Sequence, residues 1–333
     1  MKTFFSLTIN FLLLCAFMTS GLFAMGYRDY VKPGPLKETA VVAINKGQGV
    51  SSIADALTEN KVIAQPLLFK FAARVSGKHT GLHAGEYEFA AGISMREALD
   101  KMARGDVFQR RFTVPEGLTS WQIVQLLGKT PELEGEIADI PAEGTLLPET
   151  YSYMRGDTRQ QKIAAMQDAM KKTIAELLRQ RPPNAPLISE GEAVILASIV
   201  EKETAIASER RRIAGVFINR LKQGMKLQTD PTVIYAITGG KIEDKGQGPL
   251  GRRLLSADLQ FESPYNTYKY PGLPPGPIAN PGRASLEAVF NPEQHDFLYF
   301  VADGSGGHIF AATLEEHNAN VAKWREIRKQ QGN

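Results

Sequence analysis

Two glutamates and a threonine end the apolar run VILASIVEKETA, residues 194–205. A helical register of 100° per residue places Glu203 on the side of the apolar residues and Glu201 nearly opposite. A carboxyl group among apolar neighbours has its charged form disfavoured, and the resulting rise in pKa suits a general acid at neutral pH. Glu203 is therefore the candidate proton donor, whereas Glu201 and Lys202 are expected to be solvated. The pattern leaves open a second interpretation, in which Glu203 marks the end of a core helix where the chain returns to water.

The helix that must hold Glu203 has a clear start in the sequence. Ser189 and Glu192 form the Ser-x-x-Glu capping pattern, so the helix is predicted to begin at Glu190 and to run past Val200. The apolar line of this helix, within about 60° of one direction, consists of Glu192, Leu196, Ile199, Val200, Glu203, Ile206 and Ala207.

Other polar residues have simpler expected roles. Asp230 stands directly before Pro231 in LQTDPTVIYAI, which predicts an N-cap with proline at the first helical position. Glu149 in LLPETY is a candidate for a turn or a substrate contact. His308 and His317 lack metal-ligand spacing, and the sequence holds no serine-hydrolase or phosphate-loop motif. We therefore expect no metal and no cofactor.

The segment PYNTYKYPGLPPGPIANPG, residues 264–282, is too long and too rich in proline for an ordinary connector. Its tyrosines and apolar side chains disfavour disorder. Tyrosine faces, together with amides such as Asn266, suit a neutral polar polymer such as a sugar chain. The segment is predicted to wall a substrate groove, and a rigid packed loop without a ligand is the alternative.

Composition narrows the function further. The chain has 333 residues, of which 43% are hydrophobic and 23% charged, and its formal net charge is +3. No block of lysines and arginines exists that would follow a phosphate backbone, so nucleic acid is not an expected partner. The single cysteine, Cys15, lies inside an N-terminal apolar run. The folded part therefore has no thiol for a disulfide, a nucleophile or a metal.

An uncharged run from Thr3 to Tyr27 is long enough to cross a bilayer. It is longer than the apolar core of a signal peptide and ends in a weak cleavage site, so we predict a retained anchor rather than a cleaved signal. Lys2 precedes the run and no second apolar span follows, which places the rest of the chain across the membrane, in a bacterium the periplasm. The anchor and its short cytoplasmic end are assigned to residues 1–27, and a polar, proline-containing linker to residues 28–38.

The remaining chain is predicted to be an α+β protein in two parts. Residues 39–110 alternate strand and helix patterns in a small module, and residues 111–333 form a mostly helical α+β domain with the substrate groove. The I-A-x-x-L pattern at Ile53, Ala54 and Leu57 resembles a LysM module, a small carbohydrate-binding fold of cell-wall proteins. A purely structural unit is the alternative.

Seven motifs follow one another along the chain: ASIVEKETA, FINRL, LQTDPTVIY, YNTY, GLPPGPIANPG, YFVADGSGGHIF and EHN. With the apolar N-terminus, the LysM-like module and LLPETY, they make nearly the whole chain resemble the endolytic murein transglycosylases of the MltG, or YceG-like, family. The resemblance implies a single-pass protein of the cell inner membrane that cleaves nascent peptidoglycan glycan strands in the periplasm. It also implies that the protein ends strand elongation near the penicillin-binding peptidoglycan synthases.

The resemblance further implies a mechanism and a set of site residues. The second glutamate of E-K-E-T, Glu203, matches the family's catalytic acid, and Thr204 after it would orient the carboxyl group. Protonated Glu203 would donate to the oxygen that links N-acetylmuramic acid to N-acetylglucosamine, and would then take the proton of the muramic acid 6-hydroxyl as a 1,6-anhydro ring closes. The motif positions expected to line the groove are Thr204, Asn219, Gln228, Asp230, Tyr235, Tyr265, Asn266 and His308.

Two other functions remain as alternatives. A hydrolytic muramidase would use Glu203 as the acid and Asp230 to activate water. A non-catalytic, membrane-tethered scaffold would only bind the cell wall. No function is assigned to GGKIEDKGQGPLGRR, residues 239–253, or to the tail beyond His317.

Overall fold

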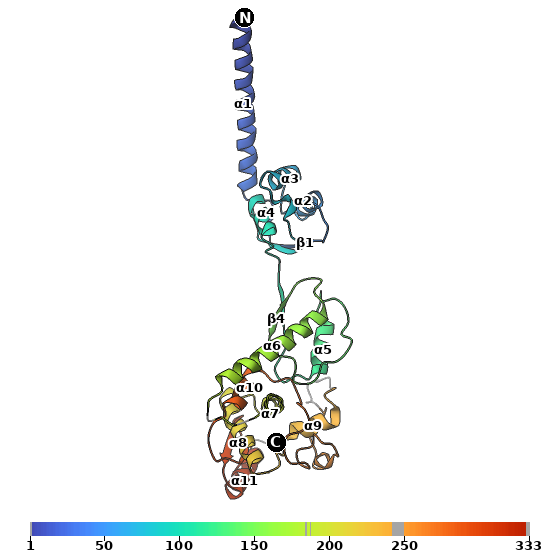
Figure 1. Ribbon diagram of the computed structural model, residues 1–333, viewed down its shortest axis with the longest axis vertical. Coiled ribbons are helices and arrows are strands. Elements are labelled where there is room, and N and C mark those ends of the chain that lie inside the picture. The colour runs from blue at the N-terminus through green and yellow to red at the C-terminus, as the bar shows by residue number, and fades with distance from the viewer. Residues whose placement is uncertain (1, 184, 187, 242–249, 331–333) are drawn as a thin grey trace. The chain divides into compact units, whose positions relative to one another are not determined.

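The computed structural model of the chain (Figure 1) describes residues 2–183, 185–186, 188–241 and 250–330. The chain forms two compact units, of which unit 1 comprises residues 1–110 with 152–155, and unit 2 comprises residues 111–151 with 156–333. Part of the segment to which no function was assigned, residues 242–249, lies outside the described residues.

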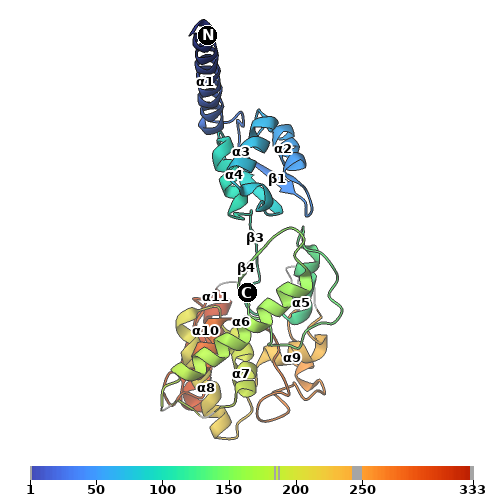
Figure 2. The same ribbon diagram turned by 45° about the horizontal axis from the view of Figure 1, so that its top comes forward.

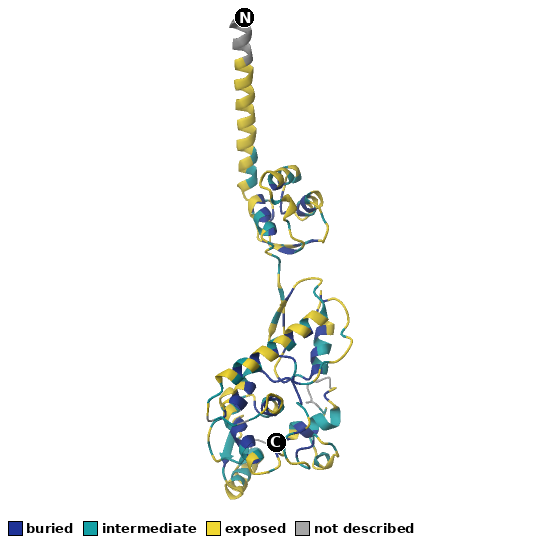
Figure 3. Ribbon diagram, viewed as in Figure 1, coloured by how far each residue is buried: buried dark blue, intermediate teal, exposed yellow. Residues whose placement is uncertain are grey.

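Unit 1 begins with α1 (Lys2–Val31), which is exposed along most of its described length (Figure 3). Within it, Ile9–Val31 is long and apolar enough to cross a membrane. The helix outlasts the expected anchor by four residues, and Leu36 is already part of the buried core of unit 1. The polar linker expected at residues 28–38 is thus helical at its start and packed near its end.

The segment after α1 lies close against the module at Gly34. A Cβ at this position would lie 2.4 Å from the carbonyl oxygen of Ile93 and 2.7 Å from that of Val62. Only glycine lets the backbone approach so closely. The Gly34 N–H donates to the carbonyls of Gly92 and Ile93, each over 3.2 Å. This turn joins α1 to the module without a free tether.

The rest of unit 1 is a small module with one two-stranded sheet. Its elements are β1 (Ala40–Ile44), α2 (Val50–Glu59), α3 (Pro66–Val75), the 3-10 turn η1 (Lys78–Thr80), β2 (Gly85–Phe89) and α4 (Met95–Ala103). β1 and β2 pair antiparallel, from Ala40 opposite Phe89 to Ile44 opposite Gly85. The I-A-x-x-L residues form the buried face of α2, so packing alone accounts for their pattern. Carbohydrate binding by this module stays a prediction.

The remaining elements follow from Arg110 onward. They are β3 (Arg110–Thr113), α5 (Ser120–Lys129), β4 (Thr150–Tyr153), α6 (Arg159–Gln180), α7 (Glu190–Glu203), η2 (Ala207–Glu209), α8 (Arg210–Lys222), α9 (Asp230–Thr238), η3 (Asp258–Gln260), α10 (Arg283–Phe290), β5 (Tyr299–Ala302), β6 (His308–Ala311) and α11 (Leu314–Gln330). β3 pairs with β4, and β5 pairs antiparallel with β6. This mixture of helix and strand, about half of it helical, agrees with the predicted α+β class.

The core of unit 2 is built around α7, which packs against α8 and α10 (Figures 1 and 2). α6 packs on α10 and adds Met170 and Leu177 to this core. All but one of the α7 residues from Ala193 to Val200 are buried. Because neighbours cover α7 on most sides, its sequence is apolar nearly throughout rather than along a single stripe.

Candidate functional site

α7 starts and ends close to where the sequence predicts. The Ser189 side chain accepts from the Glu192 N–H, and the Glu192 carboxylate accepts from the Ser189 N–H over 2.9 Å. The helix ends at Glu203 because Thr204 adopts an extended backbone, with φ −142° and ψ 135°. The last two residues of the predicted apolar line therefore lie beyond the helix, and its first, Glu192, is an exposed capping residue.

Glu203 lies in the last turn of α7, and although the residue as a whole is partly exposed, its carboxyl group is buried. Burial raises the pKa of Glu203 above its ordinary value, and the negative charge of Asp230 raises it further. A contact with the Thr229 hydroxyl and the positive charges of His308 and Arg220 lower the pKa of Glu203. Because burial is the largest effect, Glu203 stays protonated to higher pH than an exposed glutamate.

Thr229, the residue before α9, brings a buried hydroxyl to Glu203. Thr229 is 2% exposed, and its Oγ1 has no hydrogen-bond partner of standard geometry among the described residues. The hydroxyl is near enough to lower the pKa of Glu203, but the contact falls short of a fully formed hydrogen bond. The Thr229 N–H donates to Thr267 Oγ1 over 3.1 Å, and its carbonyl accepts from Thr232 Oγ1 over 2.7 Å. Hydrogen bonds with residues of both the LQTDPT and the YNTY motif thus hold Thr229 in place.

Arg220, inside the FINRL motif, is a buried cation near Glu203 that the sequence analysis missed. Its Nε donates to the Leu298 carbonyl and its Nη1 to the Leu227 carbonyl, each over 2.6 Å. Its guanidinium lies 5.4 Å from the centroid of the Tyr299 ring. Burial lowers the pKa of Arg220, which nevertheless remains a cation at neutral pH. A basic residue within an apolar helix was the available signal, since arginine is seldom buried without partners.

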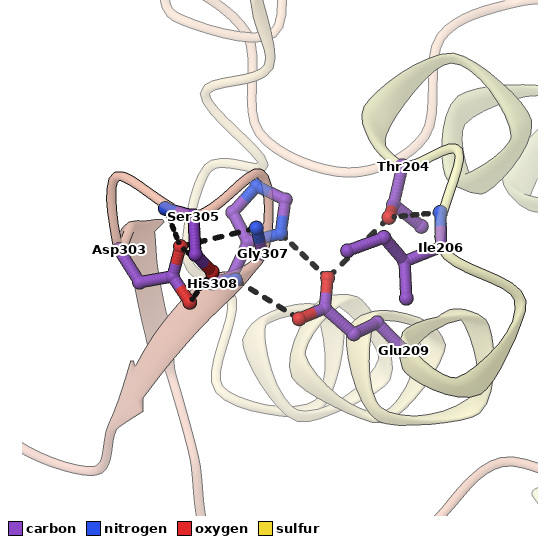
Figure 4. Close-up of polar contacts among 7 residues, drawn as sticks. All are labelled: Thr204, Ile206, Glu209, Asp303, Ser305, Gly307 and His308. Atoms are coloured by element: carbon purple, nitrogen blue, oxygen red, sulfur yellow. Dashed lines mark hydrogen bonds and ion pairs between the residues drawn. The ribbon is translucent and has the colours of Figure 1, made fainter.

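A second carboxylate, Glu209, links Thr204 to His308 (Figure 4). Glu209 Oε1 accepts from the backbone N–H of His308 over 2.9 Å, and Oε2 accepts from its Nδ1 over 2.7 Å. The Thr204 hydroxyl donates to the same Oε2 over 3.4 Å and accepts from the Ile206 N–H over 3.0 Å. Thr204 is 6% exposed. Its hydroxyl contacts Glu209 and not Glu203, and its roles in orienting Glu203 and in lining the groove stay predictions.

His308 is held at the start of β6 by this carboxylate and by a tight turn. With Nδ1 engaged by Glu209, the other ring nitrogen, Nε2, is the one that can address a ligand. In the turn, Asp303 Oδ1 accepts from the N–H groups of Ser305 over 2.7 Å and Gly307 over 3.1 Å. A Cβ on Gly307 would lie 3.0 Å from Glu209 Oε1, so glycine at this position leaves room for the bond.

Glu201 is buried rather than solvated, which corrects the sequence prediction. Its side chain is 5% exposed, and its Oε1 lies 3.6 Å from Arg210 Nη2. Its Oε2 accepts from the Gly282 N–H over 2.9 Å. The face of α7 opposite Glu203 is covered by the start of α8 and by the loop before α10, and not by solvent. Lys202, between the two glutamates, is exposed as expected.

Asp230 and Gln228 flank Thr229 at the surface. The N-cap of α9 is Thr229, so Asp230 is its first helical residue and not the cap that the sequence predicts. Asp230 Oδ1 accepts from the Tyr268 hydroxyl over 2.6 Å. Gln228 has a φ of 51°, and its N–H donates to the Thr267 carbonyl over 3.2 Å. Both side chains are exposed, and contact with a ligand stays a prediction for each.

Tyr235 and Tyr265 lie together beside a pocket next to α7. Their ring centroids are 5.0 Å apart, with the ring planes at 47°. Burial raises the pKa of Tyr235, whose hydroxyl bonds to Glu143. The pocket has a volume of about 310 Å³ and is lined by Thr119, Gln122, Lys202, Pro231, Ile234, Tyr235, Thr238, Gly240 and Ile278. A mixture of aromatic, apolar and hydrogen-bonding side chains suits a sugar ring.

Asn219 and Asn266 are bonded within the protein instead of facing a ligand. Asn266 is 0% exposed, and its amide nitrogen donates to the carbonyls of Leu259 over 3.0 Å and Phe261 over 2.8 Å. This burial contradicts the prediction that Asn266 lines the groove. The Asn219 amide nitrogen donates to two carbonyls within residues 295–297, which ties α8 to the segment before β5.

The proline-rich segment 264–282 is largely a packed loop. Asn280 is 0% exposed, and its amide oxygen accepts from the Leu146 N–H over 2.9 Å. The Ile278 N–H donates to the Ser198 hydroxyl of α7 over 3.0 Å, while its side chain lines the pocket. The alternative of a rigid loop therefore describes most of the segment, and only a few of its residues lie at or beside the pocket.

The arrangement around Glu203 provides a carboxyl group whose pKa is raised by burial, with the Thr229 hydroxyl, the Arg220 guanidinium and the His308 ring placed to stabilise its conjugate base. Such a group can give a proton to a leaving oxygen and take one back from a hydroxyl. Among the described residues, no three His, Cys, Asp or Glu side chains are grouped as metal ligands would be.

Comparison with known proteins gives concordant results. The model of the YceG-like family matches residues 42–323. The endolytic murein transglycosylase of Bacillus subtilis (strain 168) is 34% identical over 319 residues, which are 86% of this chain and 85% of that protein. That of Streptococcus pneumoniae (strain ATCC BAA-255 / R6) is 30% identical over 95% of this chain and 64% of its own length.

A solved structure is also similar to the chain. The crystal structure of the yceG-like protein lmo1499 from Listeria monocytogenes is 33% identical and has a TM-score of 0.54. The match covers 85% of this chain and 98% of that one. The resemblance drawn from the seven motifs is thereby confirmed, and the chain belongs to the YceG-like family.

Proposed function

We propose that this chain is an endolytic murein transglycosylase, which cleaves the bond from N-acetylmuramic acid to N-acetylglucosamine within peptidoglycan glycan strands. The observation that carries the proposal is the buried carboxyl group of Glu203, whose pKa is raised and which lies near Thr229, Arg220 and His308. The family and the names of the relatives in Bacillus subtilis and Streptococcus pneumoniae support the class of reaction.

In the proposed reaction, Glu203 acts first as an acid and then as a base. It donates its proton to the glycosidic oxygen as the bond between that oxygen and C1 of the muramic acid breaks. The resulting carboxylate accepts the proton of the muramic acid 6-hydroxyl, whose oxygen bonds to C1 and closes a 1,6-anhydro ring. No water is consumed, and Glu203 ends protonated, so a single carboxyl group suffices.

The surroundings of Glu203 fit both halves of this cycle. Before proton transfer, burial and the charge of Asp230 favour the acid form. After transfer, the Arg220 cation, the His308 ring and the hydroxyl of Thr229 stabilise the carboxylate. Groups that are already oriented toward the place where charge develops lower the barrier without reorganising.

The position of Asp230, a second carboxylate close to Glu203, favours a second candidate function, a hydrolytic muramidase. Asp230 is the carboxylate whose charge acts on Glu203, and the Tyr268 hydroxyl holds it in place. In a hydrolase Asp230 would activate water on the other side of the sugar ring. The two reactions leave different ends, because hydrolysis gives reducing ends and ring closure gives 1,6-anhydro ends.

The proposal includes where the enzyme works. α1 supports a single-pass anchor in the inner membrane, with the module and unit 2 in the periplasm, where nascent glycan strands are made. Cleavage there would end strand elongation close to the penicillin-binding synthases. The LysM-like module would add carbohydrate binding, and the pocket beside Tyr235 would hold a sugar of the strand.

The variant Glu203→Gln tests the proposal. Full-length protein in detergent is incubated with purified glycan strands, and the products are identified by mass spectrometry. We expect anhydro-ended fragments from the wild type and a rate at least about 100-fold lower from the variant, since a positioned acid and base contributes that much or more. Glu192→Gln, at the exposed start of the same helix, is the matched control and should retain activity.

Three results would contradict the proposal. Reducing ends alone from the wild type would identify a hydrolase. Equal activity of Glu203→Gln and the wild type would remove Glu203 from the chemistry, and no cleavage by the wild type would favour a binding scaffold. Folding is checked by thermal unfolding: because the pKa of Glu203 is raised in the folded state, its contribution to stability is lost as pH rises through that pKa, so the variant should be the more stable protein at alkaline pH.

A further inference from the structure

α3 leaves a stripe of large apolar side chains uncovered. Leu67, Phe71 and Val75 are 78%, 58% and 69% exposed. Their spacing of four residues puts them on one side of the helix. The other side is buried in the module through Phe69 and Ala73. An exposed apolar patch of this kind marks a surface that meets a partner or a membrane.

This stripe continues the apolar surface of α1. The two helices lie side by side in both views (Figures 1 and 2), and a Cβ on Gly26 would lie 3.7 Å from Leu68 Cδ1. The Gln65 amide donates to Asp29 over 2.9 Å, which ties the start of α3 to the end of α1. Between the helices runs an apolar groove of about 460 Å³, whose lining includes Leu22, Phe23, Tyr27, Leu68, Phe71 and Val75.

The length of α1 determines how deep in a bilayer this groove would lie. α1 has 30 residues, so it is about 45 Å long. A hydrocarbon core of about 30 Å takes up about 20 of these residues. A core that starts near Thr3, at the beginning of the uncharged run, has its outer boundary near Leu22, and one that starts at Ile9 has it near Arg28. α3 therefore lies at the boundary of the bilayer, where Tyr27 and Tyr30 also match the aromatic belt of membrane proteins.

The charges of α3 fit a membrane surface. The only charged residues in its sequence, PLLFKFAARV, are Lys70 and Arg74. At the end of α1, Arg28 and Lys32 both form ion pairs with Asp29, so these three residues together add one net positive charge. A helix with an apolar face and basic residues beside it is typical of segments that lie in the lipid interface, because the cations attract anionic headgroups.

We infer that α3 is an interfacial membrane helix. Leu67, Phe71 and Val75 insert among the acyl chains of the leaflet on the module's side, and lipid tails fill the groove between α1 and α3. The inference rests on α1 crossing the membrane and is independent of the proposed reaction. The partner of this apolar stripe and groove is the bilayer itself, because both continue the surface by which α1 meets lipid.

Depth measurements in lipid nanodiscs test the inference. The full chain carries Cys15→Ser, which removes its one cysteine, and Phe71→Cys labelled with an environment-sensitive fluorophore. The discs contain phosphatidylethanolamine and phosphatidylglycerol and hold one chain each. We expect the label at position 71 to be quenched several-fold more by lipids with spin-labelled acyl chains than a label at Glu88→Cys, the exposed position of β2. The label at position 71 should also be less accessible to aqueous iodide.

A third label, at Phe17→Cys within α1, shows whether α1 itself is inserted, since Phe17 is 78% exposed on that helix. If lipid quenches position 17 but iodide reaches positions 71 and 88 equally, the inference is wrong. If position 71 is shielded from iodide yet not quenched by lipid, protein and not lipid covers it, and the inference is again wrong. If position 17 is not quenched either, α1 does not span the bilayer and the inference fails with it. None of these results depends on glycan cleavage.

Discussion

The proton on Glu203 is controlled by groups that act in opposite directions. Burial and Asp230 favour its acid form, while Thr229, Arg220 and His308 favour the carboxylate. At the scale of single residues, the structure therefore predicts how changes to these groups alter the pH dependence and the rate of the reaction.

Thr229→Val removes the hydroxyl next to Glu203 and keeps the shape of the side chain. Because a donor to the carboxylate lowers the pKa of Glu203, its loss should raise that pKa. The alkaline limb of the kcat/KM profile should then move to higher pH. The measurement is the rate of glycan cleavage between pH 5 and pH 9. Thr229→Ser restores the hydroxyl and should restore the profile; identical profiles for all three proteins would exclude this role of Thr229.

Glu209→Gln weakens the hold on His308 without touching Glu203. The Glu209 carboxylate accepts from the backbone N–H and from Nδ1 of His308. An amide has one acceptor oxygen, so it cannot accept both bonds in the same way and holds the His308 ring less firmly. We expect kcat/KM to fall about tenfold, less than the loss of a group that itself transfers the proton.

Asp303→Asn is the control for Glu209→Gln, because it weakens the same β5–β6 turn without contacting the His308 ring. Glu209 acts as a positioning residue if its variant lowers kcat/KM and Asp303→Asn does not. Equal losses in both would mean that the turn alone matters.

Single residues were predictable where helical geometry decides and unpredictable where contacts between distant segments decide. The capping box at Ser189 and the register of one helix led to Glu203. No spacing rule brings Glu209 to His308, which are 99 residues apart, or Thr229 to the end of α7. The resemblance assigned Thr204 to orient Glu203, whereas the extended backbone at Thr204 turns its hydroxyl to Glu209.

At the scale of elements, α7 is supported on the side away from the chemistry by the loop that precedes α10. Glu201 accepts from the Gly282 N–H, and Ser198 accepts from the Ile278 N–H. The register of α7 put Glu201 opposite Glu203, but periodicity does not reveal that a loop 80 residues later covers that face. The segment 264–282 was predicted to wall a substrate groove, but its asparagines Asn266 and Asn280 are buried and hold the loop within the protein.

Asn280→Ala should destabilise unit 2. The change leaves the buried Leu146 N–H without its acceptor and the Leu118 carbonyl without the donor of the side chain. The Leu118 carbonyl keeps its bond from the Asn280 backbone N–H, so the Leu146 N–H is the group left unsatisfied. We expect the free energy of unfolding to fall by about 1–3 kcal/mol, the cost of one unsatisfied buried group. Trp121 and Trp324 both lie in unit 2, so tryptophan fluorescence during urea unfolding follows this unit alone.

The exposed Asn291→Ala serves as the control for Asn280→Ala. Asn291 bonds to Arg211 at the surface, so its loss should change the free energy of unfolding by about 0.5 kcal/mol or less. Similar unfolding midpoints for Asn280→Ala and the wild type would show that the loop does not stabilise unit 2.

At the scale of the whole molecule, the chain divides into a unit that carries the membrane helix and a unit that carries Glu203. The apolar N-terminal helix and the α+β class followed from hydropathy and periodicity, because both depend on residues close in sequence. The continuation of α1 to Val31 was not anticipated. The sequence predicted a polar, proline-containing linker at residues 28–38, whereas Gly34 makes a close backbone contact with the module and Leu36 belongs to its core.

The turn at Gly34 has a mechanical consequence. Since it joins α1 to the module within one compact unit, the module has no hinge of its own between itself and the helix. In the proposed membrane-anchored state, any tilt that the bilayer imposes on α1 becomes a tilt of the module by the same angle. The thickness of the bilayer would thereby set the orientation of the module relative to the membrane surface.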